Sequence, residues 1–244
     1  MFEYINEIQR LLKVIKQDEE TVIDTAQGLM VDCIQGQHAL YGFGASHAGI
    51  LIEELYYRAG GLAVFNPIFA KNLMLDTQPI SLTSTLERLE GFGTSIAQKT
   101  KISKNDVVLI HSVSGRNCAA IEIALYCKNM GAKSICITNL AYSKSVNSRH
   151  SSGLRLFEIC DVIIDNHGCI GDSAIPLASI KQKVGPTSTV IGAAIVNQLV
   201  VNVAKIIEDH GSIPPIFYSA NLDEGDDLNK EVVKEYQDII KFEF

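Results

Sequence analysis

The chain has 244 residues, of which 47% are hydrophobic and 20% charged, a balance that excludes a disordered chain and indicates a globular protein. Its formal net charge of −7 provides no attraction for nucleic acid or an anionic membrane, so we expect neither as a partner. No apolar run approaches the ~18 uninterrupted residues of a membrane span, and the N-terminus lacks the features of a secretion signal.

Apolar spacing divides the chain into alternating helices and strands. Helical spacing covers residues 1–35, and short apolar strands are expected over His38–Phe43, Leu62–Pro67, Asp106–Val113, Ser134–Thr138 and Asp161–Asp165. Helices are expected over Ser46–Ala59, Ser81–Thr100, Asn117–Met130 and Pro186–Asp209, followed by an acidic amphipathic tail over Gly225–Phe244.

Strands that are apolar throughout and alternate with helices indicate a parallel sheet covered on both faces. We therefore expect a doubly wound α/β fold with five parallel strands, in a single domain over residues 1–244. Its core is residues 36–209, with helices at 1–35 and a helical tail at 210–244. In such folds ligands bind at the carboxyl ends of the strands, near the switch point in strand order.

The six cysteines carry a prediction about location. Cys33, Cys118, Cys127, Cys136, Cys160 and Cys169 are scattered without a Cys-x-x-Cys pair, mostly inside apolar runs. This pattern favours buried free thiols in a reducing compartment over disulfides or a metal cluster. We expect a cytoplasmic protein with no metal site.

The loop after the first strand reads Gly42-Phe43-Gly44-Ala45-Ser46-His47-Ala48-Gly49. Glycines let the backbone approach a ligand, and the following helix offers free N–H groups. A dinucleotide site would place an acid after the second strand, which instead ends Val64-Phe65-Asn66-Pro67. A P-loop would end in Lys-Ser/Thr, which is absent. A phosphate site and a plain turn with a capping serine both remain open on this loop alone.

The loop after the third strand reads His111-Ser112-Val113-Ser114-Gly115-Arg116-Asn117 and again opens a helix. Two alternate hydroxyls, a glycine and a helix N-terminus make a compact oxyanion site. His111 itself is compatible with a hydrogen-bonded core histidine.

Together the segments GFGAS and SVSGR resemble the phosphate loops of the sugar isomerase (SIS) family. The resemblance spans roughly residues 36–209 and implies a flavodoxin-like fold. It implies phosphate binding by Ser46, Ser112 and Ser114, with Thr187, Ser188 and Thr189 near the ligand. From the residues themselves, Gly44, Gly115 and Asn117 are expected to complete the two loops, and Arg116 adds charge there, caps its helix or contacts another subunit. Stretches such as EELYYRAGGL and VGPTSTVIGA are similar to one bacterial branch of this family, from which Phe43 and Ala45 depart.

Isomerisation of a sugar phosphate needs a base that moves a proton between adjacent carbons. The glutamate base of phosphoheptose isomerases corresponds to Tyr56 here, whereas Glu53 lies one helical turn earlier on a similar face. Glu90 resembles a glutamate of the MurNAc 6-phosphate etherases, and His47 comes directly after the loop serine. Glu53, Glu90 and His47 are the catalytic candidates, each weighed against an ordinary surface or structural role.

The resemblance implies a cofactor-free sugar-phosphate isomerase acting on an aldose or ketose phosphate. An amino-sugar-phosphate lyase or etherase and a non-catalytic phosphosugar sensor are the alternatives. Members of the family generally pair, so a homodimer or homotetramer is expected.

Overall fold

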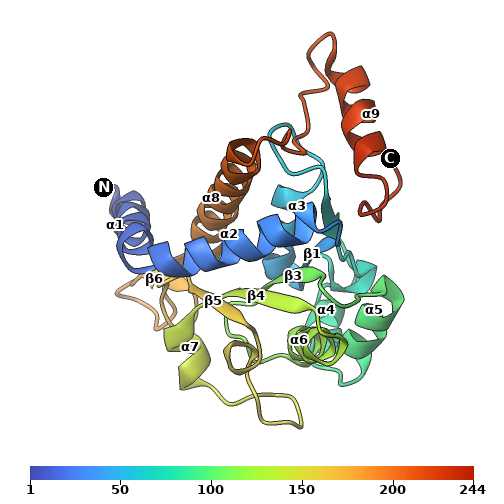
Figure 1. The fold of residues 1–244 in the computed structure, drawn as a ribbon. Helices are drawn as coiled ribbons and strands as arrows, with labels where there is room; N and C mark the ends of the chain where they lie inside the picture. The colour runs from blue at the N-terminus through green and yellow to red at the C-terminus, as the bar shows by residue number, and fades with distance from the viewer.

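A five-stranded parallel sheet forms the centre of this computed structural model, which describes all residues from Met1 to Phe244 (Figure 1). The strands are β1 (Leu40–Gly44), β2 (Phe65–Pro67), β3 (Val107–His111), β4 (Lys133–Thr138) and β5 (Val162–Asp165). They lie in the order β2-β1-β3-β4-β5, and each neighbouring pair is parallel. This order is the flavodoxin-like one, so the predicted doubly wound fold is confirmed.

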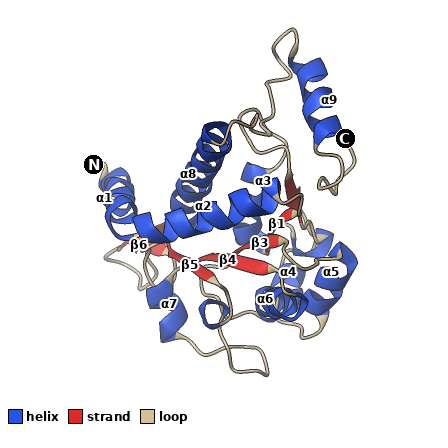
Figure 2. Ribbon diagram, in the orientation of Figure 1, coloured by secondary structure: helices blue, strands red, loops and turns tan.

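Helices cover both faces of the sheet (Figure 2). One face carries α1 (Glu3–Asp18), α2 (Glu20–Gln35), α3 (Ile50–Leu55) and α8 (Ser188–Asp209). The other side carries α4 (Ser81–Leu86), α5 (Phe92–Thr100), α6 (Cys118–Met130) and α7 (Leu140–Ser145). Short 3-10 turns lie at Ser46–Gly49, Lys71–Leu73 and Leu156–Glu158.

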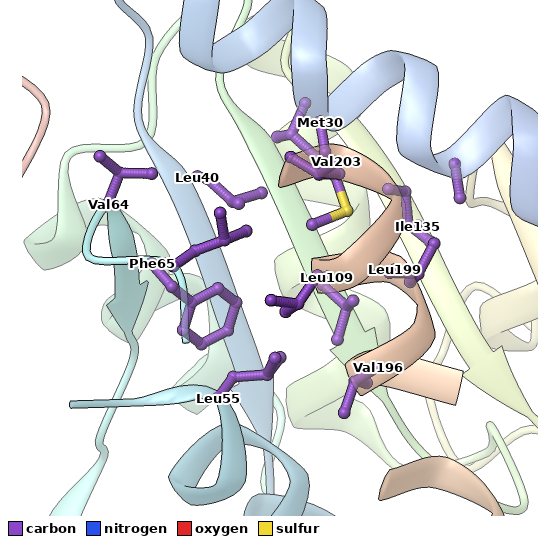
Figure 3. Packing of buried hydrophobic residues seen from close by; sticks show 14 of the residues in the cluster. Met30, Leu40, Leu55, Val64, Phe65, Leu109, Ile135, Val196, Leu199 and Val203 are labelled. Atoms are coloured by element: carbon purple, nitrogen blue, oxygen red, sulfur yellow. The ribbon is translucent and has the colours of Figure 1, made fainter. Parts of the chain in front are cut away.

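Alternate residues of each strand enter two separate cores. Leu109 packs in the core shared with α2 and α8, whereas its neighbours Val108 and Ile110 pack in the core shared with α6. Figure 3 shows Met30 of α2 and Leu199 of α8 in the first of these cores, close to Leu109. Because both faces of the sheet are buried, the strands are apolar throughout instead of alternating with polar residues.

The longest helix, α8, is apolar enough in composition to cross a membrane, with a mean hydropathy of 1.9 over its most apolar window. Nine of its 22 residues are buried, and they include Ile195, Leu199 and Val203. These side chains pack in the core beneath α2, which is the arrangement of a core helix.

Two predicted elements are shorter than expected because the chain turns at particular residues. The helix expected over Ser81–Thr100 is two helices, interrupted at Gly91, whose φ of +87° lies in the left-handed region. The helix expected over Ser46–Ala59 begins as a 3-10 turn and ends at Leu55.

The strand expected over Leu62–Pro67 is divided between two partners. Only Phe65–Pro67 joins the sheet as β2, while Leu62 forms an antiparallel bridge with Ile216. Asn66 is buried at the end of this segment, and its Nδ2 donates to the carbonyl of Ile239 at 2.9 Å. The C-terminal tail is therefore attached to the sheet edge through Asn66.

The C-terminal region and one hairpin complete the fold. Helix α9 (Gly225–Glu235) lies away from the main body in Figure 1. Because it ends at Glu235, the helical part of the tail is shorter than the predicted Gly225–Phe244. Strands β6 (Ser173–Ile175) and β7 (Val184–Pro186) form an antiparallel hairpin before α8 that the apolar pattern did not indicate.

Candidate functional site

A cavity of about 300 Å³ opens where β1 and β3 end. The helix after β1 lies on one face of the sheet and the helix after β3 lies on the other. The two connecting segments therefore diverge and leave a crevice between them. The volume is at the lower end of the range for small-molecule sites. This is the location that the switch-point rule predicts.

The loop after β1 is curled tightly against itself. A Cβ on Gly44 would lie 2.5 Å from the carbonyl carbon of Ala48, so no larger residue fits there without a backbone shift. Ser46 has a φ of +55°, a strained value for a residue with a side chain. The tight turn brings both Ser46 and His47 to the cavity wall.

The loop after β3 is held from behind by β4. The hydroxyl of Thr138 donates to the carbonyls of Ser112 (2.7 Å) and Val113 (3.1 Å). Gly115 has a φ of +58°, and a Cβ there would lie 2.7 Å from Ser143 Oγ. With the backbone fixed in this way, Ser112 and Ser114 both line the cavity.

Helix α6 begins directly behind this second loop. Asn117 is its N-cap residue and lines the cavity with Ala119 and Ala120, which belong to the first turn. A helix N-terminus carries a partial positive charge that favours an anion. The hydroxyls of the two loops and this helix end therefore converge on one space suited to a phosphate group.

Glu87 is a carboxylate that lines this cavity together with the two serine loops, and the sequence analysis did not select it. It is the first residue after α4, and its carbonyl accepts a hydrogen bond from Ala119 N–H at 3.0 Å. Burial raises the pKa of Glu87, although Asn117, Arg88 and Arg149 oppose this rise. A cavity carboxylate with a raised pKa has the properties of a general base.

Glu90, three residues further on, is placed differently. It is exposed, and its Oε1 accepts a hydrogen bond from the Ser151 N–H at 2.6 Å. Hydrogen bonding from the side chain of Ser151, and then from its backbone N–H, lowers the pKa of Glu90. Both glutamates lie in the turn between α4 and α5 but have different surroundings: Glu87 lines the cavity, and Glu90 accepts a hydrogen bond from a neighbouring loop.

His111 ends β3 and lies buried at the cavity wall. Its Nδ1 lies 3.0 Å from the carbonyl of Ala48, which can only accept, so Nδ1 carries the proton. Burial lowers the pKa of His111, which keeps the ring neutral. Its Nε2 then presents a lone pair, and this atom has no hydrogen-bond partner within the protein. The expectation of a fully hydrogen-bonded core histidine therefore holds for Nδ1 alone.

The structure gathers part of the predicted site and leaves other residues apart. Ser46, His47, Ser112, Ser114 and Asn117 line the cavity, while Gly44 and Gly115 shape the backbone of its two loops. Glu53 is exposed on α3, and neither it nor Glu90 or Arg116 lines the cavity.

Thr187, Ser188 and Thr189 lie at the start of α8, outside the cavity lining. Ser188 donates to Asp172 through both its N–H (2.9 Å to Oδ1) and its hydroxyl (2.7 Å to Oδ2). Asp172 itself lines the cavity. Thr187 and Ser188 thus position a wall residue that the sequence did not indicate, because Asp172 belongs to the unpredicted turn before β6.

Comparison with known proteins is consistent with this geometry. The SIS domain family profile matches residues 3–139. A UPF0309 protein of Shouchella clausii is 48% identical over 98% of this chain and 98% of its own. A UPF0309 protein of Oceanobacillus iheyensis is 46% identical over 99% of this chain and 98% of its own.

Two solved structures share the fold at low sequence identity. Phosphoheptose isomerase GmhA from Neisseria gonorrhoeae has a TM-score of 0.52 at 14% identity, covering 84% of this chain and 95% of that one. A phosphoheptose isomerase from Francisella tularensis has a TM-score of 0.54 at 14% identity, covering 83% and 95%. With a family profile over more than half of its length and relatives that align almost end to end, the chain belongs to the SIS domain family.

Proposed function

We propose that this protein binds a sugar phosphate in the cavity between β1 and β3 and isomerises it between aldose and ketose forms. The observation that carries the proposal is the convergence of Ser46, Ser112 and Ser114 with Glu87 on one cavity. The hydroxyls and the α6 N-terminus provide a site for the phosphate. Glu87 provides the base, and no cofactor is needed for this reaction.

The proposed reaction moves one proton between neighbouring carbons. The Glu87 carboxylate removes the proton from C2 of the open-chain aldose, which leaves a cis-enediolate, and the same carboxyl group returns a proton to C1. The accompanying proton moves between the two oxygens. Burial favours the neutral form of Glu87, so the carboxylate that remains is more basic than an exposed one.

Two histidines are suited to the oxygens of the substrate. The lone pair on His111 Nε2 can accept a hydrogen bond from a sugar hydroxyl, because the Nδ1 proton is committed to Ala48. His47 lies at the cavity wall with an exposed side chain, which suits the predicted proton transfer to and from the oxygens. Glu53 and Glu90 stay as predictions, and Glu87 is preferred over both because it lines the cavity.

The proposal also includes the assembly and its location. Val190 and Val201 of α8 are exposed, as is Leu12 of α1, and burial of such apolar side chains favours a homodimer or homotetramer. Five of the six free cysteines are buried, which suits the reducing cytoplasm. Light scattering coupled to gel filtration measures the assembly directly.

A lyase or etherase acting on an amino-sugar phosphate would begin with the same proton abstraction by Glu87. A sensor would bind the sugar phosphate without turnover. These alternatives differ from the isomerase in the fate of the bound sugar, and one experiment separates them.

The test is incubation of candidate sugar phosphates with the protein in D2O, with NMR detection of the products. An isomerase produces the ketose with deuterium at C1 and, by the reverse reaction, aldose with deuterium at C2. A lyase releases an eliminated group, and a sensor does neither. Glu87→Gln should abolish exchange while keeping the ligand-induced rise in thermal midpoint, and Glu90→Gln is the matched control that keeps both. Full exchange in Glu87→Gln would refute the assignment of the base, and loss of exchange in Glu90→Gln would support the sequence prediction instead. Ser114→Ala should lose the thermal shift itself.

A further inference from the structure

Three chain segments that carry an arginine meet beside the cavity, and their arginines, Arg88, Arg116 and Arg149, are here called the arginine triad. The N–H of Arg149 donates to the carbonyl of Arg116 at 2.9 Å, so these two backbones are in contact. The turn that carries Arg88 contacts the same loop, since Ser151 N–H donates to Glu90 Oε1 at 2.6 Å. Each arginine therefore comes from a different segment, and hydrogen bonds hold the three segments together.

The triad is joined to the cavity through Asn117. The guanidinium Nη1 of Arg149 donates to Asn117 Oδ1 at 2.7 Å, and Asn117 is a cavity-lining residue. Arg88 comes directly after Glu87, which lines the cavity from the opposite segment. The triad thus lies at the rim of the proposed phosphosugar site, adjacent to its phosphate loops.

No arginine of the triad forms an ion pair, although the other three arginines of the chain each do. Arg10 pairs with Glu7, Arg58 with Glu54 and Arg155 with Glu158. The chain has 28 acidic residues, so partners are not scarce.

Two of the nearby acids are already engaged by backbone N–H groups, and the third, Glu87, is shared by Arg88 and Arg149. The carboxylate of Glu122 accepts from the N–H groups of Gly91 and Thr94, and Glu90 accepts from Ser151. Glu87 faces the cavity. Arg116 has a buried Nε with no hydrogen-bond partner.

Arg88 and Arg149 act on one carboxylate, that of Glu87, so the three gathered cations exceed the negative charge beside them. Partial burial, together with the charges of Arg88 and Arg116, lowers the pKa of Arg149, as expected when like charges are held close. Guanidinium groups bind carboxylate and phosphate through paired hydrogen bonds, and arginines are commonly used for this recognition. A cluster of unpaired arginines at the rim of a ligand site therefore has the chemistry of an anion-binding site.

We propose that the arginine triad binds a second anionic group of the substrate, so that the natural ligand is a sugar phosphate carrying a further carboxylate or phosphate. This inference rests on the proposed function, because it assigns the first phosphate to the serine loops. It specifies the substrate class: sugars with two anionic groups, here called doubly anionic, are favoured over sugars whose single anionic group is one phosphate.

The test compares the affinities of four probes by titration calorimetry at one fixed ionic strength. The probes are glucose 6-phosphate, 6-phosphogluconate, fructose 1,6-bisphosphate and inorganic phosphate. We expect one or both doubly anionic sugars to bind at least about tenfold more tightly than glucose 6-phosphate, the range of a well-formed charged contact. A preference for 6-phosphogluconate assigns a carboxylate to the triad, and a preference for fructose 1,6-bisphosphate assigns a phosphate.

Substitutions localise this preference. Arg88→Gln and Arg149→Gln should weaken the doubly anionic sugars more than glucose 6-phosphate and reduce the ratio of their affinities. Arg10→Gln changes the net charge equally but lies on α1 in an exposed pair with Glu7, and it should keep the ratio. Unfolding midpoints without ligand identify any variant that fails to fold, in which case the other triad variant decides.

The outcomes separate the two proposals. Equal affinity of the wild type for glucose 6-phosphate and for the sugars with two anionic groups would overturn the role of the triad while leaving the phosphosugar site intact. A ratio that is unchanged in both triad variants would also overturn it. Absence of binding by every sugar phosphate would refute the proposed function itself.

Discussion

Replacing Gly44 with alanine places a methyl group where the loop after β1 folds back on itself. The added Cβ would lie 2.5 Å from the carbonyl carbon of Ala48 and 2.8 Å from the nitrogen of Gly49, and both neighbours are backbone atoms. The loop cannot simply move aside, because the Ala48 carbonyl also accepts from His111 Nδ1 at 3.0 Å. The substitution should therefore shift the loop that carries Ser46 and His47.

We expect Gly44→Ala to lower the free energy of unfolding by about 1–3 kcal/mol, the range for overpacking a tightly packed site. Gly28→Ala is the matched control. Gly28 lies inside α2 with no atom within 4 Å of its added Cβ, so the same change should stabilise by roughly 0.5–1 kcal/mol through helix propensity.

Urea unfolding with linear extrapolation measures both free energies, and thermal shifts with sugar phosphates measure binding by the same variants. Gly44→Ala should lose most of the ligand-induced shift, whereas Gly28→Ala should keep it. If Gly44→Ala proves as stable as the wild type and binds equally well, the loop relaxes freely and our account of its shape is wrong.

Three further predictions concern the polar side chains of Glu87, Asn66 and Asp172. Folding raises the pKa of Glu87 above 4.5, so its ionisation opposes folding; this penalty is absent below the unfolded pKa and complete above the folded one. Glu87→Gln should accordingly be more stable than the wild type at pH 7, with a difference that shrinks as the pH falls towards 4, and a wild type that is the more stable at pH 7 would contradict this. For the proposed isomerisation, the same raised pKa should move the acidic limb of the activity profile above the usual range of glutamate. Asn66→Ala should lose roughly 2–4 kcal/mol of unfolding free energy, because it leaves the carbonyl of Ile239 and the N–H of Lys241 without their buried partner. Limited proteolysis should then cleave the C-terminal tail early, and unchanged protection would show that the tail is attached elsewhere. Asp172→Ala removes the acceptor at the start of α8 and should lower the unfolding free energy by roughly 1–2 kcal/mol, measured in urea; a neutral effect would mean that Ser188 is not capped by it.

The sequence alone determined the architecture and located the two serine loops that border the cavity. Continuous apolar runs such as Val107–His111 predicted a sheet buried on both faces, and burial of alternate residues in two cores confirms the reason. The loops of Ser46 and Ser114 were identified because glycines, hydroxyls and a following helix lie close together in the chain. These are local features, and local periodicity and spacing report them directly.

Only the tertiary structure decided which carboxylate faces the cavity. Glu87 and Glu90 are three residues apart in the turn between α4 and α5. The hydrogen bond from Ala119 to the Glu87 carbonyl and the hydrogen bond from Ser151 to the Glu90 carboxylate give them different surroundings. The division of the second predicted strand, which pairs Leu62 with Ile216, has the same origin.

The arginine triad and the lone pair on His111 likewise depend on partners that are distant in the chain. Amphipathic periodicity shows which face of an element is buried but carries no information about which remote segment covers it. Contacts of that kind are set by packing of the whole chain, and the chemistry of this site lies in them.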